Sequence, residues 1–497
     1  MRIRSAQPND DSAGGVQAGG LARLLVGLAL LVGSVGGCGT DGERGATENA
    51  GPMGDTLRVA SVSSVDSVWA GLPVDFALLT HEDRQFVAYY DHERRLTVAA
   101  RTLGRDDWTR VRLVERVPWD SHNYLTMAVD ANDQLHLSGN MHVDPLTYFR
   151  TEEPLDIRTL ERVGEMVGRD EEKCTYPSFL KGPDGRLVFG YRDGGSGDGR
   201  RIYNVYDAEA ERWTRLLDTS LLDGSPQDMN AYPIGPTRGP DGDFHVVWMW
   251  RNTPDAATNH DLSYMRSADL RHWETAGGTS LSLPVTPSDS ATVVDPAGPG
   301  EGLINMGFAL GFDHRERPVI GYHRYDDAGD SQIYNARWEG RAWQIYQTSD
   351  WSARWDFGGR GSLPSRVGAG AVRPVDAEGR GEGRLAQPYW HWKQGEGAWL
   401  LDPKTLQPVG QTVLDPPRPA RVERVRSEAP GMRVQWARDA RQEETGGRAT
   451  GAGHTAVRYQ LRWETLGRNR DRPRTDAVPP PSTLEVYAFT DSTTTGS

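Results

Sequence analysis

The stretch LKGPDGRLVFGYRD (residues 180–193) is the unit that decides the fold. It has an apolar entry, a turn led by Asp184, and then alternating apolar residues, which is the pattern of a β-hairpin. The same pattern recurs in MAVDANDQLHLSGN (127–140), TRGPDGDFHVVWMW (237–250) and LGFDHRERPVIGYH (310–323). The turn aspartates set a repeat of about fifty to seventy residues, a period typical of β-propeller arrays.

A second sequence pattern alternates with these hairpins. It predicts a strand, a turn and a second strand that begins with tryptophan. It recurs as LTVAARTLGRDDW (96–108), IYNVYDAEAERW (202–213), LSYMRSADLRHW (262–273) and IYNARWEGRAW (333–343). Four strands per repeat fit a propeller blade, because a blade buries both faces only between two neighbours. The sequence therefore predicts an all-β fold, a seven-bladed β-propeller over residues 57–414, with these tryptophans packed between blades.

The C-terminal part alternates like strands in MRVQWARD (432–439), TAVRYQLRWETL (455–466) and TLEVYAF (483–489). We expect residues 415–490 to form a β extension, which either closes the ring with the first blade or makes a small appended sandwich. We expect residues 491–497 to be a disordered tail.

The N-terminal part carries a targeting signal. LARLLVGLALLVGSVGGC (21–38) is a short apolar core that ends in small residues and Cys38, too short to span a bilayer comfortably. It resembles a bacterial lipoprotein signal, which predicts removal of residues 1–37, lipid on Cys38, a flexible tether over 38–56 and anchoring in the cell envelope. The alternative is an ordinary secretory signal with an incidental cysteine. Cys174 is the only other cysteine, so we expect neither a disulfide framework nor a cysteine-rich zinc site.

The composition narrows the class of partner. The net charge of −13 is spread along all 497 residues, which argues against nucleic acid. An acidic substrate stays possible, because a local cluster of arginine and histidine can overrule the global sign. With 57 Gly and 31 Pro, the chain suits many short strands joined by tight turns.

Three of the twelve histidines fall in DSHNYLTMAVDANDQLHLSGNMH (120–142). His136 alternates into the middle of its strand, so we expect it to pack in the core. His122 lies just before one strand of the hairpin and His142 just after the other, so the hairpin can return both imidazoles to one end. We interpret these two as functional.

The following blades present polar residues at equivalent ends, which a propeller brings together at a central pocket. Tyr176 lies before a strand and Arg192 after the next, beside the glycine-rich DGGSGDG (193–199). Packing in a turn is an equally good explanation for Tyr176 alone. The later blades add, in chain order, Tyr232, Arg251, Asn259, His260, His323 and Arg324.

These residue types indicate one chemistry better than others. Paired carboxylates for glycoside hydrolysis are not conspicuous, and there is no Ser-His-Asp elbow or phosphate loop. Histidine, tyrosine and arginine suit β-elimination from a uronic acid, in which a cation neutralises the sugar carboxylate, a base removes the adjacent proton and an acid protonates the leaving oxygen.

At DSHN, GNMH, TYP, YRDG, NHDLSY and YHRYD the sequence resembles the BNR-repeat-like family that includes the seven-bladed propeller ulvan lyases, over roughly residues 57–410. The resemblance implies His122 and Tyr176 jointly as acid and base, Arg192 as carboxylate neutraliser, and His142 and Tyr232 as flanking substrate contacts. It also implies that no cofactor is needed for the chemistry, while a structural metal ion with unidentified ligands can be present. The remaining residues are assigned as substrate contacts from blade-end position alone: Arg251, Asn259, His260, His323 and Arg324.

Three functions stay open. The leading one is a lipid-anchored polysaccharide lyase that acts on an acidic, ulvan-like polysaccharide. The second is a glycoside hydrolase on the same scaffold, acting on a rhamnosyl-glucuronic type of linkage. The third is a carbohydrate-binding propeller without catalysis, in which Trp248 and Trp250 stack on sugars.

Overall fold

The computed structural model describes residues 57–375, 383–414, 418–440, 457–475 and 477–490. All of them belong to one compact unit, Gly54–Ser497. The predicted signal with Cys38, the predicted tether and the predicted tail lie outside the described residues. Within the described ranges, no helix is both long enough and apolar enough to cross a bilayer.

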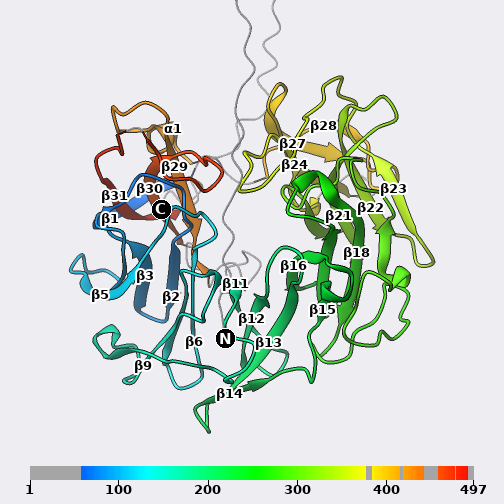
Figure 1. The fold of residues 1–497 in the computed structure, drawn as a ribbon. Coiled ribbons are helices and arrows are strands. Elements are labelled where there is room, and N and C mark those ends of the chain that lie inside the picture. The colour runs from blue at the N-terminus through cyan, green and yellow to red at the C-terminus, as the bar shows by residue number, and fades with distance from the viewer. Residues whose placement is uncertain (1–56, 376–382, 415–417, 441–456, 476, 491–497) are drawn as a thin grey trace, which may run out of the picture. The chain divides into compact units, whose positions relative to one another are not determined.

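In the described part of the chain, the strands form seven antiparallel sheets (Figure 1). The first four are: first sheet, β2 (Ala77–His81), β3 (Arg84–Tyr90), β4 (Arg95–Thr102), β5 (Thr109–Arg116); second sheet, β6 (Leu125–Val129), β7 (Leu135–Gly139), β9 (Tyr148–Thr151), β10 (Leu160–Arg162); third sheet, β8 (His142–Asp144), β11 (Cys174–Lys181), β12 (Leu187–Asp193), β13 (Arg200–Asp207), β14 (Arg212–Arg215), β15 (Leu222–Asp223); fourth sheet, β16 (Asn230–Arg238), β17 (Phe244–Arg251), β18 (Asn259–Ser267), β19 (Val293–Asp295).

The other three sheets complete the unit. They are: fifth sheet, β20 (Ala309–Phe312), β21 (Pro318–Tyr325), β22 (Ser331–Trp338), β23 (Trp343–Gln347); sixth sheet, β24 (Val367–Ala369), β25 (Arg373–Val375), β26 (Arg384–His391), β27 (Gly395–Leu401), β28 (Pro408–Gln411); seventh sheet, β29 (Met432–Arg438), β30 (Arg458–Leu466), β31 (Ser482–Thr490), β1 (Arg58–Val68). The helical segments are short: α1 (Ala420–Glu423) and four single 3-10 turns at Ile157–Thr159, Ser225–Gln227, Ala256–Thr258 and Ser290–Thr292.

Several sheets that follow one another in the chain contact each other, and the seventh sheet contacts the first. The strand β6 contacts both β2 and β11, β16 contacts β13, β24 contacts β21, and β29 contacts β2. Because a sheet in such a stack is covered on both sides, its middle strands are buried on both faces, and every residue of β12 is buried, the polar Arg192 and Asp193 included.

The repeated aspartates make the predicted hairpin turns. Asp130 Oδ1 accepts hydrogen bonds from the backbone N–H groups of Asn132 and Gln134, at 2.8 and 2.9 Å. Asp184 does the same for the N–H of Arg186 at 3.1 Å. An aspartate that caps the backbone two residues ahead fixes where the chain reverses, which explains why this residue marks each repeat.

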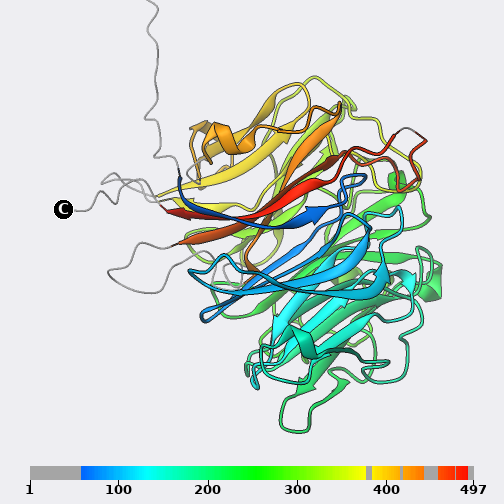
Figure 2. The same ribbon diagram turned by 90° about the vertical axis from the view of Figure 1, so that its left-hand side faces the viewer.

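The seventh sheet combines the two ends of the described chain. Strand β1 runs antiparallel to β31, with Arg58 opposite Thr490 and Val68 opposite Ser482. Figure 2 shows β1, in blue, beside the red β31. The C-terminal strands therefore share a sheet with the first strand instead of forming a sandwich of their own.

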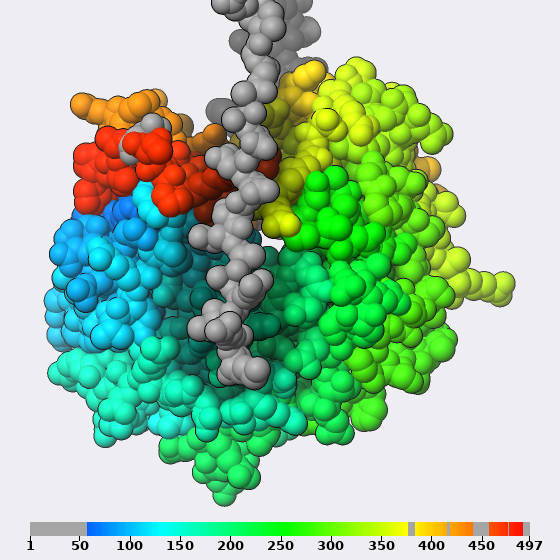
Figure 3. All heavy atoms as spheres, in the orientation of Figure 1, coloured from blue at the N-terminus to red at the C-terminus, as the bar shows by residue number. Residues whose placement is uncertain are grey.

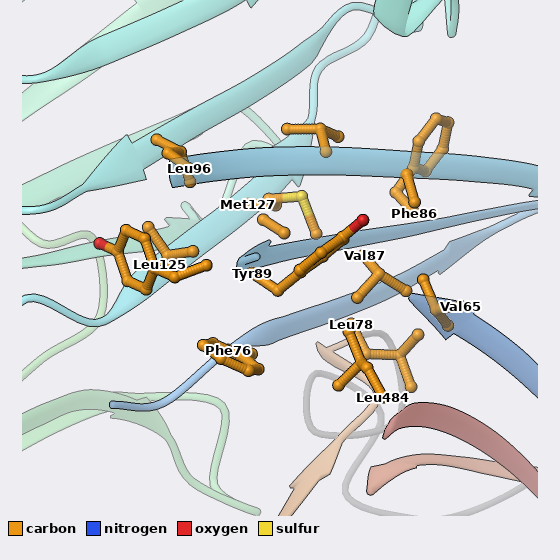
Figure 4. Close-up of a cluster of buried hydrophobic side chains, with 14 of the residues drawn as sticks. Val65, Phe76, Leu78, Phe86, Val87, Tyr89, Leu96, Leu125, Met127 and Leu484 are labelled. Carbon is orange, nitrogen blue, oxygen red and sulfur yellow. The ribbon is translucent and has the colours of Figure 1, made fainter. Parts of the chain in front are cut away.

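The largest core cluster joins the seventh, first and second sheets (Figure 4). Leu484 of β31, Leu78 of β2 and Met127 of β6 all belong to it. Burial of such apolar side chains contributes roughly 1.5–3 kcal/mol each, so contacts between sheets dominate the stabilisation of the fold.

The repeated tryptophans pack as predicted. Trp108, Trp213 and Trp273 are all buried, and Trp343 is partly buried against the core between the fourth and fifth sheets. Trp248 and Trp250, the residues expected to stack on sugars in a carbohydrate-binding propeller, are buried too. At 0% and 2% exposure they offer no surface on which a sugar can stack.

The core position predicted for His136 is confirmed, since its side chain is fully buried. Its Nδ1 lies 2.7 Å from the Tyr148 hydroxyl and its Nε2 lies 3.1 Å from Asp130 Oδ2. The fourth sheet has an equivalent set, in which His245 bonds to Tyr264 and Asp241. A buried polar group needs such partners, so this histidine is a satisfied part of the repeat.

Candidate active site

Cross-strand register in the third sheet gathers residues that lie far apart in the sequence. Thr175 on β11 pairs with His142 on β8 at one side and with Arg192 on β12 at the other, and Arg192 pairs with Arg201 on β13. Directly opposed residues project from the same face of a sheet, so these four side chains form one row. The guanidinium carbon of Arg192 lies 4.9 Å from the ring centroid of Tyr176.

The fourth sheet repeats this arrangement. Asn230 on β16 pairs with Arg251 on β17, and Arg251 pairs with Asn259 on β18. The guanidinium carbon of Arg251 lies 5.1 Å from the ring centroid of Tyr232. Neighbouring sheets therefore each present a tyrosine beneath an arginine.

A bulge in β11 projects Tyr176 out of the ladder. The register shifts just before Ser178, and Tyr176 has a φ of 57°, a left-handed conformation that is rare for a bulky residue. Two neighbours bind the carbonyls that the bulge frees: Arg201 Nη1 donates to Tyr176 O at 3.0 Å, and the Tyr124 hydroxyl donates to Pro177 O at 3.1 Å. These bonds hold Tyr176 in its strained position.

A cavity of about 300 Å³ opens between the third and fourth sheets. Figure 3 shows the molecule hollowed where the teal and green segments meet. The residues that line the cavity are Tyr124, Tyr176, Ser178, Arg192, Gly199, Arg201, Asn230, Ala231, Tyr232, Pro233, Ile234, Gly235, Asn305 and Phe308. Three of the predicted site residues are among them: Tyr176, Arg192 and Tyr232.

The two predicted imidazoles stack beside this cavity. The rings of His122 and His142 have centroids 4.1 Å apart, and the ring of His122 lies 5.9 Å from that of Tyr176. Both Nδ1 atoms approach one carboxylate, with His122 Nδ1 2.6 Å from Asp120 Oδ1 and His142 Nδ1 2.5 Å from Asp120 Oδ2.

Asp120 sets the tautomer of both rings. Burial acts to raise the pKa of Asp120, but the hydrogen bonds from His122 and His142 hold it well below its usual range. An ionised carboxylate only accepts hydrogen bonds, so each Nδ1 donates to Asp120, and the neutral tautomer compatible with this bond has its lone pair on Nε2.

A second carboxylate comes from the C-terminal part of the chain. Asp471 accepts hydrogen bonds from the backbone N–H of Ser121 at 3.0 Å and of Ser362 at 2.8 Å, and its Oδ2 lies 3.7 Å from His122 Nδ1. It ties the loop that carries His122 to two segments distant in sequence.

The two arginines differ in how far their donors are used. Arg192 is 4% exposed; its Nη2 donates to Thr175 Oγ1 at 3.1 Å, and its buried Nε has no partner. Arg251 donates from Nε to Thr253 O at 3.0 Å and to Asp255 O at 3.2 Å, and from Nη2 to Pro254 O. Arg192 thus keeps donors for a ligand, whereas Arg251 is held by backbone carbonyls.

The two phenols have opposite electrostatics. Burial raises the pKa of Tyr176 to about 12, despite the opposing effect of Arg192. Burial also acts against ionisation of Tyr232, but Arg251 and Arg192 outweigh it, so the pKa of Tyr232 lies below its ordinary value of 10.0. A nearby arginine therefore lowers the pKa of Tyr232 below its ordinary value, whereas at Tyr176 burial outweighs the same effect.

Other predicted contacts lie away from the cavity. Asn259 is fully buried; its Nδ2 donates to Ala256 O at 2.6 Å and lies 3.4 Å from the Oδ1 of Asn305, which does line the cavity. His260 is 8% exposed, and its Nδ1 lies 2.8 Å from Asp261 Oδ2.

His323 and Arg324 are not brought to this site, which corrects the use of blade-end position alone as a guide. His323 has no exposed surface, its Nδ1 lies 2.5 Å from Gly302 O, and burial lowers its pKa to about 4. Arg324 is bound to both oxygens of Asp295, at 2.9 and 3.0 Å. Both residues therefore complete the fifth sheet's own interactions.

Asp120, His122 and His142 are the residue types that bind divalent metal ions, and their ligand atoms lie within 4.8 Å of one another. In the structure each imidazole Nδ1 bonds to one oxygen of the Asp120 carboxylate, at 2.6 Å for His122 and 2.5 Å for His142.

Sequence reasoning missed Asp120, Asn230, Arg201 and Asp471. Asp120 stands two residues before His122 in the DSHN motif, and that spacing was the available signal. Arg201 and Asn230 enter through strand register, and Asp471 through a contact across 350 residues, which no local pattern reveals.

Comparisons with known proteins agree with this architecture. Over 151 residues, or 28% of each chain, the sequence is 26% identical to the short isoform of ulvan lyase from Alteromonas sp. (strain LOR). It is 25% identical over 152 residues to the long isoform from Pseudoalteromonas sp. (strain PLSV), of which it matches 15%. The aligned region thus spans less than a third of these relatives.

Solved structures share the fold. The crystal structure of polysaccharide lyase Uly1 has a TM-score of 0.56 at 12% identity and covers 87% of this chain and 99% of its own. A PL25 ulvan lyase has a TM-score of 0.52 at 14% identity and covers 85% of this chain and 94% of its own. The model of a BNR repeat-containing family matches residues 84–351, more than half of the sequence. The chain belongs to this BNR repeat-containing family.

Proposed function

We propose that this protein is a polysaccharide lyase that cleaves a uronic-acid-containing, ulvan-like polysaccharide by β-elimination, and that its seven sheets are the blades of one β-propeller. The observation that carries the proposal is that Tyr176 and Arg192 line one cavity, and that the ring of His122 lies 5.9 Å from the ring of Tyr176. Similarity to ulvan lyases supports the substrate class, and a related lyase has been solved with -[GlcA(1-4)Rha3S]- bound.

Each group has one role in the proposed reaction. Arg192 binds the sugar carboxylate and so acidifies the proton on the neighbouring ring carbon. His122 Nε2 takes that proton, and the electrons of the broken C–H bond form the new C=C bond as the bond to the glycosidic oxygen breaks. Tyr176 donates its proton to the departing oxygen.

The acid and the base follow from the environment of each side chain. With a pKa raised to about 12, Tyr176 holds its proton at neutral pH and suits the acid role. His122 donates Nδ1–H to Asp120, which leaves Nε2 as the acceptor that a base requires. These side chains supply the proposed chemistry by themselves, and a structural metal ion with unidentified ligands remains an expectation from the resemblance.

Digestion of uronic-acid polymers, followed by ultraviolet absorbance and reducing-end assays, tests the function. Elimination yields an unsaturated, absorbing uronate, which is the result we expect. New reducing ends without absorbance would instead support the glycoside hydrolase on this scaffold. Binding without either product would support a carbohydrate-binding module.

We also propose that residues 1–37 are a lipoprotein signal and that lipid on Cys38 anchors the protein in the bacterial cell envelope. The small residues before Cys38 support this. In a bacterial host, the wild type should fractionate with membranes and Cys38→Ser should be soluble. Membrane association of both forms, or of neither, would contradict the proposal.

A further inference from the structure

Two buried donors without partners belong to residues that line the same cavity from neighbouring sheets. Arg192 Nε and Asn230 Nδ2 are both buried and unpaired, and their residues are 4% and 1% exposed. Both residues line the cavity. A buried donor is normally satisfied, so two unsatisfied donors at one cavity indicate a missing acceptor.

We propose that Asn230 is a catalytic residue which, together with Arg192, binds the carboxylate of the acidic sugar from two sides. This inference rests on the proposed function and extends it. Arg192 supplies the positive charge from β12, and the Asn230 amide supplies a neutral donor from β16. As the ring proton leaves, negative charge grows on the carboxylate oxygens, and both donors strengthen their bonds to it.

The chain fixes the orientation of the Asn230 amide through Gly199. A Cβ built on Gly199 would lie 1.8 Å from Asn230 Oδ1, and Gly199 has no unusual φ of its own. Only glycine therefore leaves room for the amide oxygen at this point. With the amide oxygen against Gly199, the unpaired Nδ2 is the amide atom that remains available to an acceptor.

The neighbouring phenol reports the same preference for negative charge. The positive charges of Arg251 and Arg192 outweigh burial and hold the pKa of Tyr232 below its ordinary value of 10.0. A position where a phenolate is favoured also favours a carboxylate or enolate oxygen, because both carry their charge on oxygen.

Binding of a short uronate oligosaccharide, compared with its carboxyl-reduced form, tests the assignment without requiring turnover. We expect the wild type to prefer the carboxylate form, and Asn230→Leu to lose about tenfold to a hundredfold of that preference, the range for a hydrogen bond to a charged group. Asn230→Asp should lose more, because a second carboxylate repels the ligand. Asn204→Leu, at a buried asparagine that does not line the cavity, is the control and should keep the preference.

A double-mutant cycle tests the orientation. Gly199→Ala should lower the preference in the wild type, since its Cβ displaces Asn230, but should add little in the Asn230→Leu background. Unchanged carboxylate preference in Asn230→Leu, or equal effects of Gly199→Ala in both backgrounds, would overturn the proposal. If the wild type binds with this preference but releases no unsaturated product, the lyase function fails, and with it the catalytic role of Asn230, while its contact with the carboxylate stands.

Discussion

The third and fourth sheets carry the same pair, a tyrosine beneath an arginine, and use it in opposite ways. Arg192 keeps a free buried donor and leaves the pKa of Tyr176 at about 12, whereas Arg251 is held by three carbonyls and, with Arg192, lowers the pKa of Tyr232. One repeat motif thus yields a phenol that keeps its proton in one sheet and an anion-favouring position in the next. The difference lies in what surrounds the pair, not in the pair.

The comparison predicts the largest effect at Tyr176. Tyr176→Phe removes the proposed acid, so turnover should fall by about 10²–10⁴-fold while oligosaccharide binding stays near the wild-type level. Steady-state kinetics and calorimetric binding on the same preparation check this. Turnover at the wild-type rate would remove Tyr176 from the mechanism.

Arg192 should differ from Arg251 when each is shortened. Arg192→Ala removes the cation nearest the substrate carboxylate, so both binding and turnover should fall, by about 2–5 kcal/mol in transition-state stabilisation. Arg251→Met should leave substrate binding much less affected, because carbonyl groups already use its donors. Equal losses in KM for the two variants would contradict the distinction.

The clamp on the β11 bulge predicts an intermediate effect. Arg201→Lys keeps the charge but loses the paired bonds to Tyr176 O and Ser178 Oγ, so we expect about a tenfold lower kcat, as for a lost hydrogen bond to a charged group. KM should change little, and Arg186→Lys on the exposed turn is the control. An Arg201→Lys enzyme with unchanged kcat would show that the bulge keeps its conformation without the bonds from Arg201.

The smallest effect is the titration of Tyr232. Its folded pKa is below 10.0, so its phenolate should form before those of the other buried tyrosines, and Tyr232→Phe should remove this first step from an ultraviolet pH titration. Because the folded state loses this proton more readily, the free energy of unfolding gains as pH rises from the folded pKa towards 10.0, and that gain is lost as pH falls through the folded pKa. Arg251→Met should shift the step to higher pH; an unchanged titration would refute the role given to Arg251.

Prediction from sequence succeeded where the signal is local and repeated. The turn aspartates and the alternating apolar residues predict the hairpins. The burial of Trp108 and Trp213 follows from their repeated position in the pattern. The pairing of His122 and His142 also follows, because one hairpin returns its two ends to the same place. Blade-end position alone failed for His323, because a position near the end of a strand does not show whether the side chain is covered. Here the rings of Trp355 and Phe357 lie against the imidazole.

The sequence by itself determined an all-β repeat and a set of histidine, tyrosine and arginine residues at hairpin ends. It could do so because turns and strands depend on the types and spacing of a few neighbouring residues. Only the tertiary structure decided which of these residues meet, since strand register, the β11 bulge and the contact of Asp471 with the Ser121 loop depend on partners distant in the chain. It also decided their chemistry. Burial and the sum of nearby charges set the proton affinity of a side chain, and neither is visible until the sheets are packed.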